Sequence, residues 1–232
     1  MQLSATDLRQ RLRTKRSVRY MIPKAVVQYI AQHDIYKSEA TNTMFEEIIN
    51  DLQMRLSPKR FAHTLGVARA AVGLAQRYGA DPEEAYIAGL LHDCAKELPL
   101  SEMQRLVDEA DIKVDMDMYV NGALLHGVSG AVMAHDRYGI IDGYILDAIR
   151  YHTTGRVGMT QLDKIIFLAD YVEETRDFPG VDYLRSLALE DLDEAVLAGY
   201  DTTIRHLLDQ ELSIYFKTIL GRNDMVRRIH NR

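Results

Sequence analysis

Histidine and aspartate side chains interrupt apolar helical faces at several places in this 232-residue chain. Four histidines continue apolar stripes with helical spacing, and one aspartate ends the apolar run KIIFLAD. A single histidine on an apolar face is more often a hydrogen-bonded core residue than a ligand, but a buried carboxylate is costly unless cations or hydrogen-bond donors meet it. Together these residues indicate a site; they are His63, His92, His135, His152 and Asp170.

A metal is the chemistry that such a set supports. His63, His92, Asp93 and Asp170 would supply neutral imidazole nitrogen and anionic carboxylate oxygen. This mixture suits a borderline divalent metal such as Fe, Mn, Co, Ni or Zn better than Mg or Ca. A metal with spare coordination positions binds water and lowers its pKa, which makes hydroxide available near neutral pH.

The spacing of His63 and His92 fits two antiparallel helices joined by a turn. Ser57-Pro58 is typical of an N-cap and first helical position, and the helix that follows should stop near Gly79. Asp81-Pro82 starts a second helix, which is predicted to run through His92. His92 and Asp93 point about 100° apart on a helix, so both reach one point only near a helix end or at a close approach of two helices. The small residues before them, Ala88 and Gly89, would allow that approach.

The fold class predicted from the apolar spacing is all-α. The spacing is helical nearly throughout, and no set of alternating runs suggests a sheet. The polar segment 37–43 is the expected boundary between a short N-terminal piece, residues 1–40, and the main body, residues 41–232. Segment 212–220 fits a strand or a helix equally well. Further predicted helices cover 44–56, 102–109, 126–137, 143–152, 161–176, 183–188 and 192–210.

Composition excludes several classes of protein. Apolar residues make up 47% and charged residues 27% of the chain, as in ordinary globular proteins. The net charge of −6 argues against a nucleic-acid-binding surface as the main role. A lone cysteine, Cys94, forms no internal disulfide, which suits a reducing compartment. No apolar run reaches the roughly 18 residues of a spanning helix, and no signal peptide is visible. We therefore expect a cytoplasmic protein with no nucleic-acid partner and no membrane contact.

The order of the polar residues resembles the His … His-Asp … Asp pattern of the HD-domain phosphohydrolase superfamily, with His63, His92-Asp93 and Asp170 at its positions. The dipeptide alone is a weak signal, but five ordered blocks are similar to the YqeK family of bacterial helical HD proteins. The resemblance runs from about residue 42 to about 223 and implies an HD-domain helical bundle. The blocks are RFAHTLGVA (60–68), AGLLHDCAKELP (88–99), LLHG (124–127), AIRYHTTGR (148–156) and KIIFLADYVEETRDFPGV (164–181).

The resemblance also implies an activity. Members of that family bind iron and nucleoside diphosphate, and they hydrolyse diadenosine tetraphosphate symmetrically to two ADP. It implies a symmetrical bis(5'-nucleosyl)-tetraphosphatase with iron as the expected metal, held by His63, His92, Asp93 and Asp170. Asp93 and Lys96 are the expected catalytic residues, and His135, which matches no family motif, is interpreted as structural. Residues expected to face the phosphates or a second metal are Arg60, His126, His152, Arg156 and Arg176.

Two alternatives remain beside this activity. Another HD enzyme, such as a nucleotidase, a deoxynucleoside triphosphatase or a phosphodiesterase, would use the same metal ligands, because the walls of a pocket set substrate choice. A non-catalytic module that senses a nucleotide or a metal is the second alternative. The intact ligand set beside Lys96 argues against it, since a sensor needs no open metal position.

Both ends of the chain have features of their own. The family tends to close with (I/V)HPxTIxARN, and this chain has LSIYFKTILGRN (212–223), with Tyr215 where a histidine is expected.

Residues 3–36 resemble the C-terminal tail of bacterial nicotinate-nucleotide adenylyltransferases, without the Rossmann domain that adenylyl transfer needs. We therefore expect residues 1–40 to be a helical appendage from a fused adenylyltransferase–HD protein. The other expected partners are the dinucleotide substrate, its nucleoside diphosphate product and a second copy of the chain in a homodimer.

Overall fold

The computed structural model describes residues 39–231, whose regular structure is entirely helical, so the all-α prediction is confirmed. The chain divides into two compact units, residues 1–51 and 52–232. The predicted appendage therefore falls almost wholly outside the described residues. The described helices are α3 (Glu39–Arg55), α4 (Pro58–Tyr78), α5 (Pro82–Leu91), α6 (Leu100–Glu109), α7 (Met116–Tyr119), α8 (Gly122–Asp136), α9 (Gly143–Tyr151), α10 (Gln161–Val172), α11 (Val181–Glu190), α12 (Leu192–Asp209) and α13 (Phe216–His230).

Helices α4 and α5 form the antiparallel pair that the sequence predicts. The side chain of Ser57 accepts a backbone N–H at the start of α4. The helix ends at Gly79, whose φ of 70° lies in the left-handed region that favours glycine. Asp81 then caps α5 by accepting the backbone N–H groups of its first turn. The short turn between these two caps returns the chain along α4.

Glycines allow the closest approaches between helices. A Cβ atom on Gly89 of α5 would lie only 2.7 Å from Cα of Ala68 on α4. In the same way, a Cβ atom on Gly127 of α8 would lie 2.6 Å from the carbonyl oxygen of Arg150 on α9. Real side-chain atoms do not approach backbone this closely, so a larger residue at either position would push two helices apart. The prediction that Gly89 permits a close approach is confirmed.

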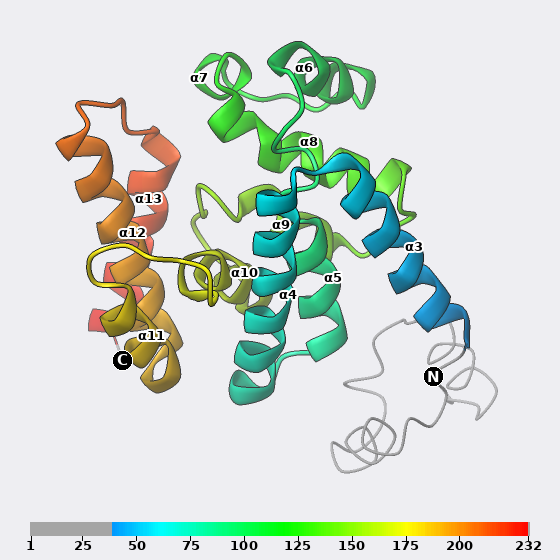
Figure 1. The fold of residues 1–232 in the computed structure, drawn as a ribbon. Coiled ribbons are helices and arrows are strands. Elements are labelled where there is room, and N and C mark those ends of the chain that lie inside the picture. Colours follow the sequence, from blue (N-terminus) through cyan, green and yellow to red (C-terminus); the bar gives the residue numbers. More distant parts are fainter. Residues whose placement is uncertain (1–38, 232) are drawn as a thin grey trace, which may run out of the picture. The chain divides into compact units, whose positions relative to one another are not determined.

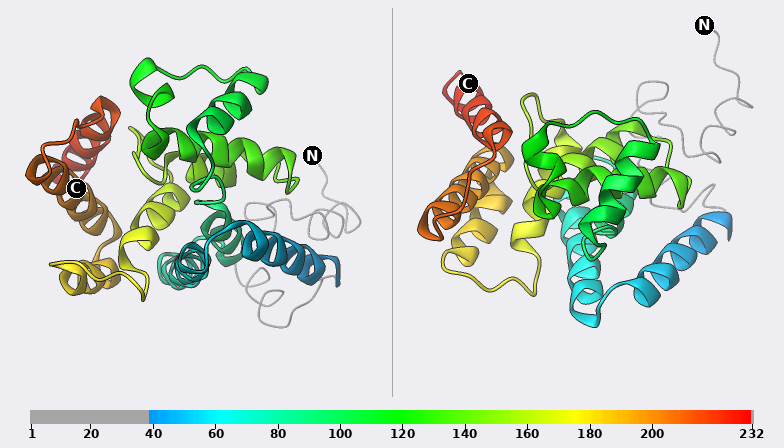
Figure 2. Two further views of the ribbon diagram at one scale, coloured as in Figure 1. Left: turned by 45° about the horizontal axis from the view of Figure 1, so that its top comes forward. Right: turned by 90° about the horizontal axis from the view of Figure 1, so that it is seen from above.

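The centre of the second unit is built from five helices, α4, α5, α8, α9 and α10, which pack on one another (Figure 1). Helix α10 joins this centre to α11, α12 and α13, which lie on one side of it (Figures 1 and 2). Helices α6 and α7 pack on α8. A small apolar cluster fills the space under them, formed by Met103, Val107, Met118, Leu125, Val128 and Tyr215.

Several helix ends differ from the sequence expectation. Helix α10 ends four residues earlier than predicted, because Glu173 adopts an extended conformation and its carboxylate accepts the N–H of Thr175. Helix α8 begins four residues earlier than predicted, after the cap residue Asn121. The undecided segment becomes helical from Phe216, and α7 was not predicted at all. In the polar segment that was the expected boundary, residues 39–43 are helical.

Tyr215, which stands where the family resemblance expects a histidine, is a packing residue. Its side chain is buried, and its hydroxyl donates a hydrogen bond of 2.6 Å to the carboxylate of Asp115. These contacts attach the start of α13 to α7.

Among the helices between residues 39 and 231, none is long and apolar enough to cross a membrane.

Replacing Gly89 by alanine should destabilise the protein, because the new methyl group meets the backbone of Ala68. We expect a loss on the order of 1–3 kcal/mol in the free energy of unfolding, measured by urea denaturation. Gly73→Ala is the matched control, since Gly73 is exposed within α4 and a Cβ there meets nothing within 4 Å. That substitution should add about 0.5–1 kcal/mol of stability. Equal effects of the two substitutions would contradict the close approach.

Candidate metal centre

Within residues 39–231, six polar side chains from five helices meet at one buried point. Nε2 of His63 lies 3.0 Å from Oδ1 of Asp170, and Nε2 of His92 lies 3.4 Å from Oδ2 of Asp93. The histidines of the cluster are at most 6% exposed, so these atoms face one another rather than water. The six residues are His63 on α4, His92 and Asp93 directly after α5, His126 on α8, His152 directly after α9, and Asp170 on α10.

The other two histidines of the cluster, His126 and His152, face the second carboxylate oxygen of Asp93. Oδ1 of Asp93 lies 3.2 Å from Nε2 of His126 and 3.5 Å from Nε2 of His152. The two Nε2 atoms are 3.0 Å apart. Asp93 therefore connects all four histidines, with one carboxylate oxygen toward each pair.

Two overlapping groups among the described residues bring donor atoms close enough to share an ion. In the first, donor atoms of His63, His92 and Asp170 lie within 4.8 Å of one another. In the second, the same holds for His92, Asp93 and His152. His92 belongs to both groups, so it is the donor on which both depend.

The ends of two helices fix the orientation of two rings. His92 and His152 are the C-cap residues of α5 and α9. Nδ1 of each lies 2.7 Å from a carbonyl oxygen three residues earlier, on Gly89 and Ile149 respectively. Carbonyls in the last turn of a helix lack an intrahelical partner, and they only accept hydrogen bonds. Each Nδ1 therefore carries a proton, and in the neutral ring the lone pair of Nε2 faces the centre.

This arrangement fits a metal ion. The Nε2 atoms of His63 and His92 and Oδ1 of Asp93 are buried without a hydrogen-bond partner among the described residues. Lone pairs of His92 and His152 face carboxylate oxygens, so acceptors face acceptors. Buried acceptors without partners cost about 1–3 kcal/mol each. A divalent cation would satisfy all of them at once, and imidazole with carboxylate is a donor set that transition metals accept.

Electrostatics keep the ligands in the forms that a metal needs. Burial would raise the pKa of Asp170, but the facing ring of His63 and the charge of Arg176 hold that pKa far below its ordinary value. The carboxylate therefore stays ionised. Burial lowers the pKa of His126 to about 4, against the opposing effect of Asp93. His126 is therefore neutral near pH 7.

Three predicted basic residues lie beside the cluster. Nη1 of Arg60 is 2.7 Å from Oδ2 of Asp93, and Nζ of Lys96 is 3.3 Å from Nε2 of His126. Arg176 pairs with the carboxylate of Asp170. Burial lowers the pKa of Lys96, while the aspartates act in the opposite direction. The side chains of Arg60 and Arg176 are 28% and 36% exposed, so both lie at the edge of the site.

Two residues singled out from the sequence lie elsewhere. The guanidinium of Arg156 is held by Asp147 at 2.9 Å and by Asp163 at 2.8 Å. Its role as a phosphate ligand stays a prediction. His135 was expected on a buried apolar stripe, and this is wrong: its side chain is 57% exposed and pairs with Asp136. Helix α8 ends one residue later, where its apolar face no longer covers the core.

Sequence reasoning missed two polar contacts of the cluster. The hydroxyl of Thr153 lies 3.1 Å from Nε2 of His126 and 3.0 Å from Nε2 of His152. A carboxylate oxygen of Glu173 lies 3.0 Å from Nδ1 of His63. Both residues stand inside the blocks that resemble the family, directly after His152 and one helical turn after the aspartate of α10. Their position next to ligands was the signal that could have found them.

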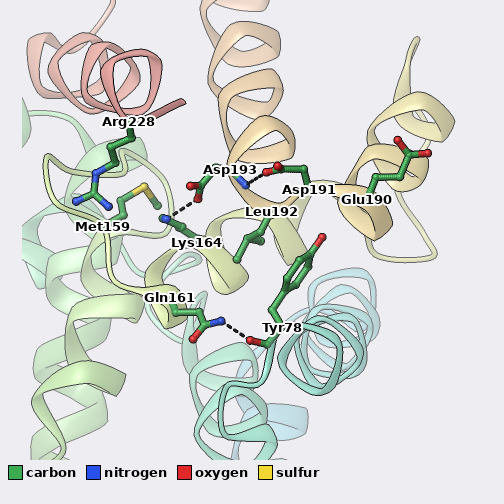
Figure 3. Close-up of a pocket in the computed structure, with 9 residues that line it drawn as sticks. All are labelled: Tyr78, Met159, Gln161, Lys164, Glu190, Asp191, Leu192, Asp193 and Arg228. Carbon is green, nitrogen blue, oxygen red and sulfur yellow. Dashed lines mark hydrogen bonds and ion pairs between the residues drawn. The ribbon is translucent and has the colours of Figure 1, made fainter. Parts of the chain in front are cut away.

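A separate pocket of about 490 Å³ lies at the start of α10, near α4, α12 and α13 (Figure 3). Lys164 pairs there with Asp193, and Gln161 donates to the carbonyl oxygen of Tyr78. Arg228 also lines it. None of the site residues predicted from the sequence lines this pocket, so it is distinct from the histidine cluster.

The sequence pattern of the HD domain matches residues 60–175. This segment carries His63, His92-Asp93 and Asp170. The chain belongs to the HD-domain family. The six clustered side chains therefore lie inside the HD domain, between its matched ends.

Relatives of this HD domain carry names that describe an activity. A Bacillus subtilis protein named bis(5'-nucleosyl)-tetraphosphatase, symmetrical, is 39% identical over 181 residues, which covers 78% of this chain and 97% of that protein. A Mycoplasma genitalium protein named probable nicotinate-nucleotide adenylyltransferase/Ap4A hydrolase is 32% identical over 183 residues, 76% of this chain and 48% of that protein.

A solved structure shares the fold. It is a crystal structure from Clostridium acetobutylicum, described as that of a predicted HD superfamily hydrolase involved in NAD metabolism. It matches with a TM-score of 0.77 and 42% identity, over 79% of this chain and 97% of that chain. The helices of this chain are therefore arranged as in that HD-superfamily structure.

Metal should stabilise this HD domain through His92, which belongs to both donor groups. The melting temperature of metal-stripped protein should rise with Mn²⁺, by the equivalent of about 2.7 kcal/mol at about 100 times the Kd. His92→Ala should lose this gain, and His135→Ala, which removes an exposed histidine, should keep it. A full gain in the His92 variant would show that the cluster does not hold the ion.

Proposed function

We propose that this chain is a metal-dependent hydrolase that cleaves diadenosine tetraphosphate symmetrically to two ADP. The observation that carries the proposal is the buried cluster of unpartnered imidazole and carboxylate acceptors within an HD domain. The name of the Bacillus subtilis relative, which the chain covers over 97% of its length, supports the substrate and the position of cleavage.

His63, His92, Asp93 and Asp170 are the ligands that we propose for the metal. The metal that we propose is iron, with Mn, Co, Ni or Zn as alternatives that suit the same donors. A divalent metal held there would supply acidified water and would offset negative charge on a phosphate. The hydrogen bonds at Nδ1 hold the rings of His63 and His92 with Nε2 toward that position.

The cations at the edge of the cluster suit a polyphosphate. Phosphoryl transfer spreads negative charge over the phosphate oxygens, and fixed positive groups beside them supply much of the catalysis. Lys96, Arg60 and Arg176 would take this role, with His126 and His152 beside them. In this structure Arg156 is bound to two aspartates, so it would have to leave them to bind a phosphate.

Asp93 has a second role in the proposal. Arg60 binds its Oδ2, while its Oδ1 is buried without a donor among the described residues. That oxygen would accept the proton of the attacking water. The water oxygen bonds to one of the two central phosphorus atoms, the bond from that phosphorus to the bridging oxygen breaks, and ADP leaves with that oxygen. The attacked half of the substrate is released as the second ADP.

We also propose that residues 1–40 are an appendage to the HD domain of residues 41–232. The name of the Mycoplasma genitalium relative, which joins an adenylyltransferase to an Ap4A hydrolase, supports an origin in a fused protein. The HD pattern begins at residue 60, which supports a hydrolase that does not use the appendage. A homodimer and a cytoplasmic location stay predictions.

Product analysis tests the proposed reaction. Metal-loaded protein incubated with diadenosine tetraphosphate should yield ADP as its only nucleotide product, separated by ion-exchange chromatography. ATP with AMP in equal amounts would contradict symmetrical cleavage. Tight binding of the dinucleotide without turnover would instead identify a sensing module, and faster turnover of mononucleotides would identify another HD activity.

Two substitutions separate metal binding from charge stabilisation. Asp93→Ala should abolish hydrolysis, because it removes a metal ligand and the proposed proton acceptor. Lys96→Ala should lower kcat by roughly 10²-fold and leave the metal content unchanged, because Lys96 contributes charge rather than a ligand. Lys113→Ala is the matched control, since the Lys113 side chain is 86% exposed. Wild-type turnover in a metal-loaded Asp93 variant would refute the assignment.

Deleting residues 1–38 should spare hydrolysis. The truncation leaves α3, which begins at Glu39, and the whole HD domain intact. We expect the kcat and metal content of the intact chain, measured side by side with the truncated protein. The full chain, given nicotinate mononucleotide and ATP, should form no dinucleotide. A truncated protein that folds and binds metal but no longer hydrolyses the substrate would place the appendage in the active site.

A further inference from the structure

His63 differs from the other clustered histidines in the group that binds its outer nitrogen. Nδ1 of His63 lies 3.0 Å from Oε1 of Glu173, a carboxylate. The outer nitrogens of the other three rings are bound by neutral backbone carbonyls. Those pairs are His92 with Gly89, His126 with Gly122 and His152 with Ile149.

Burial and hydrogen bonds hold the side chain of Glu173 at this position. Its side chain is buried, and Thr175 donates its backbone N–H to Oε2 at 2.7 Å and its hydroxyl to Oε1 at 2.5 Å. Both carboxylate oxygens of Glu173 therefore accept hydrogen bonds from Thr175, which favours the charged form and fixes its orientation.

Helix α4 leaves room for this carboxylate. Gly66 lies one turn after His63, and a Cβ atom there would collide with Oε2 of Glu173. The nearest part of Glu173 to Gly66 is thus the carboxylate itself. A glycine at this position allows Glu173 to approach the same face of α4 that presents His63.

The turn that carries Glu173 is held from α11. Arg185 donates from Nη2 to the carbonyl oxygens of Glu173 and Arg176, both at 2.9 Å, and from Nε to that of Val172 at 3.1 Å. Three carbonyls of one turn are therefore fixed by one guanidinium group. This fixes the backbone of Glu173 at the end of α10, which also carries Asp170.

We propose that Glu173 is a positioning residue that orients His63 and strengthens it as a metal donor. By accepting the Nδ1 proton, the carboxylate keeps Nε2 of His63 directed at Asp170. A charged acceptor forms a stronger hydrogen bond than a carbonyl does, and it makes the imidazole more basic. Among the clustered histidines, only His63 receives this assistance. The inference rests on the proposed function, because it requires that the cluster holds a metal.

Mn²⁺ titration of the metal-stripped full chain tests this role without any activity assay. The signal of free Mn²⁺ in electron paramagnetic resonance gives the Kd directly. Glu173→Gln keeps the size of the side chain and removes its charge, and it should weaken Mn²⁺ binding by about 10- to 100-fold. Glu174→Gln is the matched control, because the neighbouring Glu174 is 66% exposed and pairs with Arg69 on the surface. It should bind Mn²⁺ as the wild-type chain does.

A second variant and a second measurement separate this role from a purely structural one. Thr175→Val keeps the carboxylate but removes one hydrogen bond that fixes it, so it should lower the melting temperature and weaken Mn²⁺ binding less than Glu173→Gln does. In Zn²⁺-loaded, ¹⁵N-labelled wild-type protein, Nδ1 of His63 should carry the proton. A proton on Nε2 would overturn the proposal even if Glu173→Gln does not fold.

The outcomes distinguish the two levels of the argument. Wild-type protein that binds Mn²⁺, with an equal Kd in Glu173→Gln, overturns the role of Glu173 and leaves the metal centre standing. Wild-type protein that binds neither Mn²⁺ nor Zn²⁺ overturns the metal centre and this inference together. A loss of affinity that is largest in Glu173→Gln and absent in Glu174→Gln supports both.

Discussion

The structure depends on one constraint: imidazole and carboxylate acceptor atoms face one another inside a helical bundle. Two carboxylates and four imidazoles converge where water is nearly excluded, and several of their lone pairs have no donor among residues 39–231. Such a cluster opposes folding unless positive charge enters it. Arg60, Arg176 and Lys96 supply part of that charge from the edge of the site. A divalent cation would supply the rest, so the groups that would bind the metal weaken the fold without it.

Helix ends orient the histidine rings of the cluster, and small residues let the helices that carry them approach one another. His92 and His152 follow the last residues of α5 and α9, where free carbonyls bind Nδ1 and direct Nε2 inward. Gly89 and Gly127 let two helix pairs approach until these rings meet. These separate local features have the same result. Each ring has a fixed tautomer and faces the centre, as a metal ligand must.

Much of this could be predicted from the sequence, for physical reasons that differ between residues. Helical periodicity, the caps at Ser57 and Asp81 and the glycine stop at Gly79 are local signals, so the α4–α5 pair and the all-α fold followed from them. His63, His92, His152 and Asp170 could be singled out because each interrupts an apolar stripe, which the sequence shows directly, but His135 has the same pattern and lies outside the site. The metal-ligating roles themselves stay proposals.

What the sequence could not supply depends on contacts between distant segments. Glu173 reaches His63 across 110 positions of the chain, so its place one turn after Asp170 indicates that it lies near the site but does not identify His63 as its partner. Arg156 was expected at the phosphates, yet Asp147 and Asp163 hold it elsewhere.

The most direct test of the account is anomalous diffraction from Mn²⁺-loaded crystals of the full chain. The account predicts a peak with nitrogen or oxygen atoms of His63, His92, Asp93 and Asp170 within about 2.3 Å of it, as in other transition-metal sites. A loaded crystal in which these four side chains surround no peak would contradict it.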